Sequence, residues 1–403
     1  MSGSEARQGA GIGLPLTAFA LVAAFFLYEF VARILPSLAI DGIAGDLGLT
    51  NARFGTVSSV FFWVYAPMQL VVGALLDRYG ARRLVVPACA ICSGGVLLFG
   101  MSDAVPLVLL GRFLTGLGAS FAFVSALFVV THRFPPERFA LLSGVVNMIG
   151  MIGAAVGAVL LTDAMTVIGW RAAFLWTGLA GLGLAVAMLV LLPRDGTPAP
   201  RLRGPLVAGF GAIFVDTRLW LIALAGALYY MPINVFGGLW GQGELTADHG
   251  LSPVSAEVVV SMVFWGMALG SVAAGAIADR TGHRRLLVAG GATLAALCFG
   301  AAIYGTTGSA MLLGALLFLG GVFCGAQVLT FAMAREGTDA GNAGKIIAFV
   351  NMVGIASAVI FQPLIGEILD LSDGSYRISM ATIPACLIGA AALMAMGGRG
   401  ARP

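Results

Sequence analysis

The chain has 403 residues, of which 59% are hydrophobic and only 10% are charged; its mean hydropathy is +0.98 and its formal net charge is +3. An average soluble domain has about 25% charged residues, and one water-soluble core could not bury this much apolar surface, so the composition excludes an ordinary soluble protein and indicates lipid as the solvent. The basic residues form no continuous stripe, which excludes nucleic acid as an expected partner.

Residues 1–13 are polar and Gly-rich and are interpreted as a cytoplasmic tail. They do not form a signal peptide, because the apolar run that follows is too long and no small-residue cleavage site ends it. Twelve apolar runs follow, each of about 20 residues, the length that crosses a hydrocarbon core of about 30 Å. They cover approximately 15–40, 54–76, 84–101, 105–131, 139–162, 171–192, 218–240, 256–278, 286–305, 310–333, 346–369 and 377–397.

The runs divide the chain into two units. A first bundle is expected over 14–192 and a second over 218–397, followed by a short cytoplasmic tail at 398–403. The segment between them, 193–217, is rich in Pro, Gly and Arg, which is typical of a linker and is compatible with a short interfacial helix around Leu206–Phe214. The sequence therefore predicts an all-α membrane protein.

The first run carries two charges near its middle, in the stretch FFLYEFVARILPS. Each charge costs about 2.5–3.5 kcal/mol at mid-membrane, and the i, i+4 spacing places Glu29 and Arg33 on one helix face, with Tyr28 beside it. Two apolar residues would be about as stable as a buried ion pair, so we interpret the pair as a substrate or proton site, with a purely structural pair as the alternative. Glu29 is also the only acid that we place deep in a run.

An internal repeat relates the two units. Gly73–Arg83 reads GALLDRYGARR, and Gly275–Arg285 reads GAIADRTGHRR at an offset of 202 residues. A second repeat has almost the same offset, because VNMIG at 146–150 returns as VNMVG at 350–354. Two homologous halves of apolar helices are the architecture of a secondary transporter, whose binding site lies at the repeat interface near mid-membrane.

The distribution of cations predicts the orientation. When the N-terminus is placed in the cytoplasm, 17 of the 22 Lys and Arg residues lie in internal segments, and only Arg53, Arg171 and Arg377 lie in external loops. This asymmetry follows the positive-inside rule. We expect a multi-pass protein of the plasma (inner) membrane with both termini in the cytoplasm.

These motifs resemble the major facilitator superfamily, whose loop after the second span has the form G-x-L-x-D-R-x-G-x-R-R. The stretch RFLTGLGA at 112–119 is similar to the family's pattern in the fourth span, and the resemblance covers nearly the whole chain. It implies twelve transmembrane helices in two pseudo-symmetric six-helix bundles. Within the family, the arginine in the first span together with the DRYGARR loop looks most like the organic-anion and sugar-phosphate permeases and the lysosomal dipeptide carrier group.

The resemblance also implies a gate at the two repeated loops. Asp77 and Asp279 each end a helix, where a carboxylate is unfavourable against the helix dipole unless it faces a neighbouring helix N-terminus or an arginine. In the family, this loop latches the two halves together on the cytoplasmic side. A purely topogenic loop explains the arginines but not the aspartates. The implied gating residues are Asp77, Arg78, Gly80, Arg82, Asp279, Arg280, Gly282 and Arg284.

In the implied fold, the first and fourth spans line a central cavity, and Arg112 lies at a depth close to that of Arg33. Two arginines against Glu29 give a net positive cavity, which suits a carboxylate or phosphate. Further candidates could bind substrate or simply bridge helices; Asn147 and Asn351 are related by the repeat. The other candidates are Tyr28, Gln69, Tyr229, Tyr230, Asn234 and Gln327.

Our leading hypothesis is a monomeric secondary active transporter that moves a small organic anion or zwitterion by alternating access, with proton coupling through Glu29 and no cofactor. For a zwitterion, Arg33 would take the carboxylate and Glu29 the amine. One alternative is a multidrug or metabolite efflux antiporter, although Gly150–Gly157 lacks the Gly-Pro pair common in the family's drug exporters. A membrane sensor is the second alternative, and it would favour a large cytoplasmic domain.

Enzymatic and metal chemistry find little support in the sequence. The three histidines lie in loops or at a run's end without an acid-base or metal-binding constellation, and no nucleotide-binding P-loop occurs. All five cysteines lie inside apolar runs, where the CxxC spacing of Cys89 and Cys92 is read as helix packing. We therefore predict neither an enzyme nor a metal site.

Overall fold

The computed structural model describes residues 13–135, 139–193, 210–306, 308–336 and 340–396, and every regular element in these ranges is a helix. The predicted tails and most of the predicted linker lie outside the described residues. Within the described residues, eleven helical stretches are long and apolar enough to cross a membrane. One of them, α7 (Phe139–Leu191), contains two of the predicted spans, because its backbone leaves the helical region at Gly169 with φ 77°.

The chain reverses direction at Gly169, where the positive φ favours glycine. Before it, Gly153 packs against Leu27 of the first span; after it, the carbonyl oxygen of Leu192 at the far end accepts a hydrogen bond from Arg82. The element therefore crosses twice, and the predicted all-α fold with twelve spans is confirmed.

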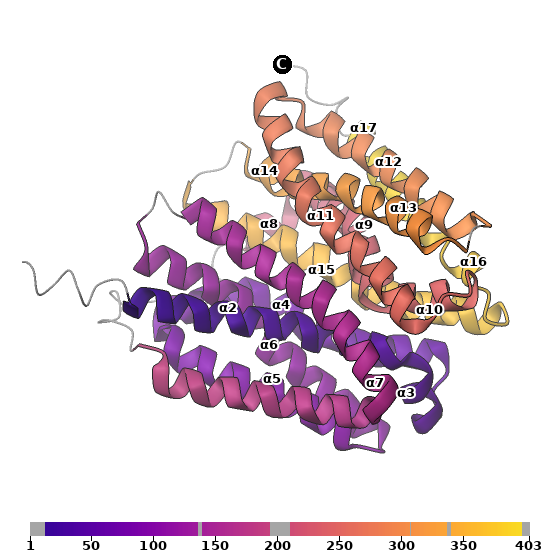
Figure 1. The fold of residues 1–403 in the computed structure, drawn as a ribbon. Helices are drawn as coiled ribbons and strands as arrows, with labels where there is room; N and C mark the ends of the chain where they lie inside the picture. The colour runs from indigo at the N-terminus through magenta and orange to yellow at the C-terminus, as the bar shows by residue number, and fades with distance from the viewer. Residues whose placement is uncertain (1–12, 136–138, 194–209, 307, 337–339, 397–403) are drawn as a thin grey trace, which may run out of the picture.

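The first half is built from helices that pack side by side, drawn in indigo to magenta in Figure 1. Its first span is interrupted and then continues to Leu47, beyond the predicted end at 40. The elements before α7 are α2 (Gly13–Ile34), the 3-10 helix η1 (Leu35–Ala39), α3 (Ile40–Leu47), α4 (Asn51–Tyr79), α5 (Ala81–Met101) and α6 (Val105–Arg133).

The second half, drawn in pink through orange to yellow in Figure 1, repeats this plan. Only Gly211–Val215, α8, is helical in the described part of the predicted linker helix. The elements that follow are α9 (Thr217–Met231), the π-helix η3 (Pro232–Trp240), α10 (Gly241–Ala247), α11 (Pro253–Thr281), α12 (Arg284–Tyr304), α13 (Ala310–Cys324), the 3-10 helix η4 (Gly325–Val328), α14 (Leu329–Arg335), α15 (Ala340–Leu371), α16 (Tyr376–Ser379) and α17 (Thr382–Met396).

The first span of each half is broken at a proline. Pro36 has no N–H to donate to the carbonyl of Ala32, so α2 ends at Ile34 and a 3-10 turn follows. Pro232 likewise begins the π-helix η3. Discontinuous helices of this kind line the binding sites of secondary transporters, and irregular turns often mark functional sites.

The halves meet along α4 with α15 and along α7 with α11. Near one end of α4 the contact is tight, because a Cβ added at Gly55 would lie 2.4 Å from the carbonyl oxygen of Gln362. A Cβ at Gly366 would lie 2.3 Å from that of Asn51. Small residues permit such close helix contact in membranes. This end, which carries Asp370, is called the Asp370 side, and the opposite end is called the Asp77 side.

Candidate functional site

A cavity of about 960 Å³ lies between the two halves. Its wall follows α4 from Tyr65 to Asp77 and α15 from Gly354 back to Gly344. Both helices thus line it down to their Asp77-side ends, whereas close contacts at Gly55 and Gly366 seal the Asp370 side. Within the described residues, the cavity therefore extends toward the Asp77 side.

Arg33 lies at the closed end of this cavity and borders it. Its Nε donates to Glu29 Oε1 at 2.8 Å, and its Nη2 donates to the same oxygen. The guanidinium carbon lies 4.5 Å from the Phe30 ring centroid and 4.9 Å from that of Tyr65. Neither bond to Glu29 uses Nη1, and a guanidinium has five N–H donors in all, which suits it to bind an anion.

Glu29 lies behind Arg33 rather than in the cavity wall. It is fully buried, and its second oxygen, Oε2, accepts no hydrogen bond from the described residues. Tyr28 also points away from the cavity, because its ring lies where a Cβ on Gly181 of α7 would stand, beside Ser93 of α5. The predicted pair is thus formed, with only its arginine facing the cavity.

The structure places Arg112 outside the cavity wall as well. This buried side chain donates to three carbonyl oxygens, those of Ser58 at 3.1 Å, Ala32 at 3.0 Å and Arg33 at 2.6 Å. The Ala32 carbonyl is the one that Pro36 leaves without an intrahelical donor. Arg112 therefore donates hydrogen bonds to carbonyl groups at the C-terminal end of α2, which lack partners within the helix. These bonds fix the backbone that carries Arg33.

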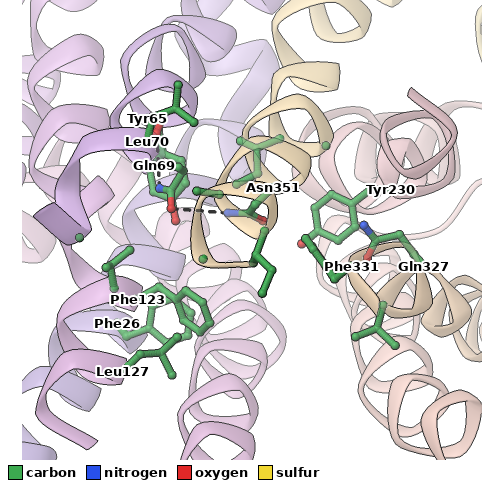
Figure 2. A pocket seen from close by; sticks show the side chains of 18 of the residues that line it. Phe26, Tyr65, Gln69, Leu70, Phe123, Leu127, Tyr230, Gln327, Phe331 and Asn351 are labelled. Atoms are coloured by element: carbon green, nitrogen blue, oxygen red, sulfur yellow. Dashed lines mark hydrogen bonds between the residues drawn. The ribbon is translucent and has the colours of Figure 1, made fainter. Parts of the chain in front are cut away.

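Other predicted residues do border the cavity, from both halves. Asn351 Nδ2 on α15 donates to Gln69 Oε1 on α4 at 3.5 Å, which links the halves (Figure 2). Tyr230 and Gln327 lie on the opposite wall, on α9 and η4. Four of the candidate residues and Arg33 are therefore brought together around one space.

The remaining binding candidates lie elsewhere. The Tyr229 hydroxyl donates to the carbonyl of Phe323 within the second half. Asn234 Nδ2 donates to Ser357 Oγ at 3.2 Å, and this asparagine only borders a small void beside Arg33. Both side chains bridge helices. The side chain of Asn147 is outside the described part of the structure.

The contacts that the described residues show for the predicted gating residues of the first loop lie within their own half. Asp77 is exposed at the cavity mouth, where it makes no hydrogen bond or ion pair with a described residue. Arg78 lies over its neighbour Tyr79, and Arg82 donates to the carbonyls of Leu189 and Leu192 in its own half. Gly80 links α4 to α5 with φ 81°.

The second loop has a similar arrangement. Gly282 links α11 to α12 with φ 70°, while Asp279 and Arg280 are exposed. Arg284 Nη1 lies 2.6 Å from Glu336 Oε1 at the end of α14. Because Arg82 and Arg284 each bind within their own half, their gating role stays a prediction.

Sequence reasoning missed several residues of the site. Tyr65 and the three rings of Phe26, Phe30 and Phe123 line the cavity, as does Lys345 at its mouth. Lys345 could have been noticed as the only lysine in the chain. Glu29 is not the only buried acid, because Glu257 and Glu244 are also buried, but these two lie near the ends of their spans, at the start of α11 and in α10.

A family model described as Major Facilitator Superfamily matches residues 16–237 and 222–401. The chain belongs to the Major Facilitator Superfamily. One relative, a probable sulfoacetate transporter of Cupriavidus necator, is 23% identical over 398 residues that cover 92% of this chain and 90% of the relative. The 3-(3-hydroxy-phenyl)propionate transporter of Escherichia coli is 27% identical over 382 residues, covering 91% and 90%.

Solved structures of the superfamily show the same fold. A bacterial homolog of the human lysosomal transporter Spinster, in an inward-facing and occupied conformation, matches with a TM-score of 0.73 over 98% of both chains, at 14% identity. Family, relatives and the two-half cavity together support a secondary transporter.

Proposed function

We propose that the protein moves a small organic anion across the membrane, bound at Arg33 and coupled to protons. The observation that carries this proposal is Arg33 at the closed end of the cavity, with Nη1 not used by Glu29. Two relatives support it, because sulfoacetate and 3-(3-hydroxy-phenyl)propionate both carry a carboxylate.

An anion fits the site better than a zwitterion does. A zwitterion would need Glu29 for its amine, but Glu29 is fully buried behind Arg33 and does not border the cavity. Asp77 does border it, but at the mouth, 12 residues along α4 from Tyr65 and therefore about 18 Å from the level of Arg33.

The proposed proton coupling rests on the ion pair between Glu29 and Arg33. An anion at Arg33 competes with Glu29 for the guanidinium, and a carboxylate that loses its cation in a buried site takes up a proton more readily. Anion and proton binding would then reinforce one another, which is the thermodynamic requirement for symport.

The cation distribution supports a cytoplasmic Asp77 side, and with that orientation the structure would be an inward-open state of alternating access. The gating role proposed for Asp77, Arg78, Asp279 and Arg280 belongs to the other state, in which this side closes.

The test is uptake of labelled organic anions into proteoliposomes that hold the full-length protein, with and without an imposed pH gradient. Wild type should accumulate an anion when the gradient is present, and Arg33→Ala should not. Arg53→Ala removes an exposed arginine and serves as the matched control. Saturable transport of lipophilic cations that survives in Arg33→Ala would favour an efflux antiporter instead, and anion binding without flux would favour a sensor.

A further inference from the structure

We propose that the transported anion carries an aromatic ring, which lies against Phe26, Phe30 and Phe123 while its acid group lies at Arg33. This inference rests on the proposed function and names the class of anion.

The three rings form a continuous row that ends at the guanidinium. The ring centroids of Phe123 and Phe26 are 5.1 Å apart, and those of Phe26 and Phe30 are 5.0 Å apart. Phe30 in turn lies 4.5 Å from the guanidinium carbon of Arg33. All four residues border the cavity. The row therefore offers a continuous aromatic surface to the body of a ligand whose acid group binds Arg33.

Gly150 of α7, which belongs to the VNMIG repeat, packs against two rings of this row. A Cβ added there would lie 2.6 Å from the ring of Phe26 and 2.8 Å from that of Phe30. Gly150 thus lets α7 press directly on both rings. Ring positions fixed before the ligand arrives lower the entropy cost of binding, and aromatic pairs at such spacing add to simple burial.

The opposite wall is also aromatic. Tyr230 and Phe331 of the second half face the cavity across from Phe26 and Phe123, as Figure 2 shows. When the halves close on a ligand, its ring can contact aromatic side chains from both sides.

A polyhydroxylated acid would have to satisfy several hydroxyls in the same space. Gln69 and Asn351 already bond to each other, and the Ser271 hydroxyl donates to Ala268 O at 3.0 Å. The other polar side chains near Arg33 in the described wall are Tyr65, Tyr230 and Gln327, fewer than the hydroxyls of a sugar acid. A buried hydroxyl without a partner is unfavourable, so a sugar acid binds less well here than an aromatic acid of similar size.

The experiment measures binding to purified full-length protein by calorimetry, with 3-phenylpropionate, 3-cyclohexylpropionate and glucuronate as probes. Burial of a ring predicts that 3-phenylpropionate binds at least about tenfold more tightly than glucuronate. The cyclohexyl acid has the same length without a π face and should bind about two- to tenfold more weakly than the phenyl acid.

Substitutions test whether the row of three phenylalanine rings causes the preference for 3-phenylpropionate. Phe123→Ala should weaken 3-phenylpropionate at least about tenfold and leave glucuronate within about twofold, and Phe123→Leu should restore only part of the loss. Phe113→Ala, on the lipid-exposed face of the same helix, is the matched control and should leave both affinities unchanged. Gly150→Ala should weaken the phenyl acid more than glucuronate.

The outcomes separate this inference from the proposed function. Glucuronate binding as tight as 3-phenylpropionate, with both lost in Arg33→Ala, would overturn the aromatic assignment and leave the anion transporter standing. Equal affinity for the phenyl and cyclohexyl acids would overturn it as well. Absence of any Arg33-dependent anion binding would overturn both proposals.

Discussion

Asp370 at the end of α15 caps the amino end of α4, which begins at Asn51 in the other half of the molecule. Its Oδ1 accepts from the backbone N of Asn51 at 3.0 Å and from Asn51 Nδ2 at 2.9 Å, and its Oδ2 accepts from the N of Ala52 at 2.8 Å. A carboxylate at a helix N-terminus is stabilised by the free N–H groups and by the helix dipole. This contact joins the two halves on the Asp370 side.

Asp370→Ala is therefore expected to shift the protein away from the state described here. Loss of a helix cap costs about 1 kcal/mol, which changes the ratio of the two states about fivefold. In a cysteine-free background, alkylation of Ser271→Cys in the cavity wall from the Asp77 side should become slower. Glu367→Ala, an exposed acid one turn earlier on α15, is the control. Unchanged alkylation in Asp370→Ala would show that the cap does not hold this side closed.

The glycines of the same seal give an independent test. Gly55→Ala places a Cβ 2.4 Å from a backbone oxygen, and Gly366→Ala places one at 2.3 Å, so the two helices must separate. Both variants should admit external reagents to the cavity more readily than wild type, as measured by alkylation of Ser271→Cys from the Asp370 side. Gly94→Ala, where an added Cβ meets nothing within 4 Å, should behave as wild type. A seal that excludes reagent equally in all three would contradict this account.

The fold could be predicted because lipid imposes strict rules on length, hydropathy and loop charge. The span boundaries were less clear where a polar residue is buried by protein. The seventh span continues past 240 to Ala247, since Gln242 and Glu244 are buried, so its apolar run ends before its helix does.

The face of each helix could not be predicted in the same way. A membrane helix is apolar toward lipid and toward its neighbours alike, so hydropathy does not distinguish the two sides of α9. Tyr229 packs toward α13, whereas Tyr230 faces the cavity, although the two are adjacent in sequence. Arg112 shows the same limit, because two of its three partners are the carbonyls of Ala32 and Arg33, which lie where Pro36 interrupts the first span.

Arg112 is expected to act on stability rather than on affinity. Hydrogen bonds to a charged group contribute about 1.5–3 kcal/mol each, so Arg112→Ala should destabilise the first half by about 3 kcal/mol or more. The apparent melting temperature should fall clearly, while the affinity of the folded fraction for an organic anion falls much less than in Arg33→Ala. A variant with normal stability and no anion binding would place Arg112 in the binding site after all.

Asp77 is expected to act on turnover. It has no partner among the described residues while the Asp77 side is open, and Lys345 borders the same mouth from the opposite half. Asp77→Asn should therefore leave the anion dissociation constant of this state within about twofold. A charge-assisted contact formed on closure contributes about 1.5–3 kcal/mol, so transport should slow about tenfold or more. Asp163→Asn, an exposed acid in α7, is the control. Normal transport in correctly inserted Asp77→Asn would remove the gating role.

Glu29→Gln separates coupling from transport. The glutamine mimics a permanently protonated Glu29 and leaves Arg33 free of its carboxylate partner, so anion binding should persist or strengthen. Exchange of labelled for unlabelled anion across the membrane should continue, because the loaded carrier can still change state. Accumulation against a gradient should fail, because no proton is bound and released in each cycle.

Arg33→Ala is the contrasting variant, which should lose exchange and accumulation together. Proton-driven accumulation that survives in Glu29→Gln would show that Glu29 is only a structural partner of Arg33. The coupling would then belong to another group, and the buried Glu257 is the first residue to substitute in the search for it.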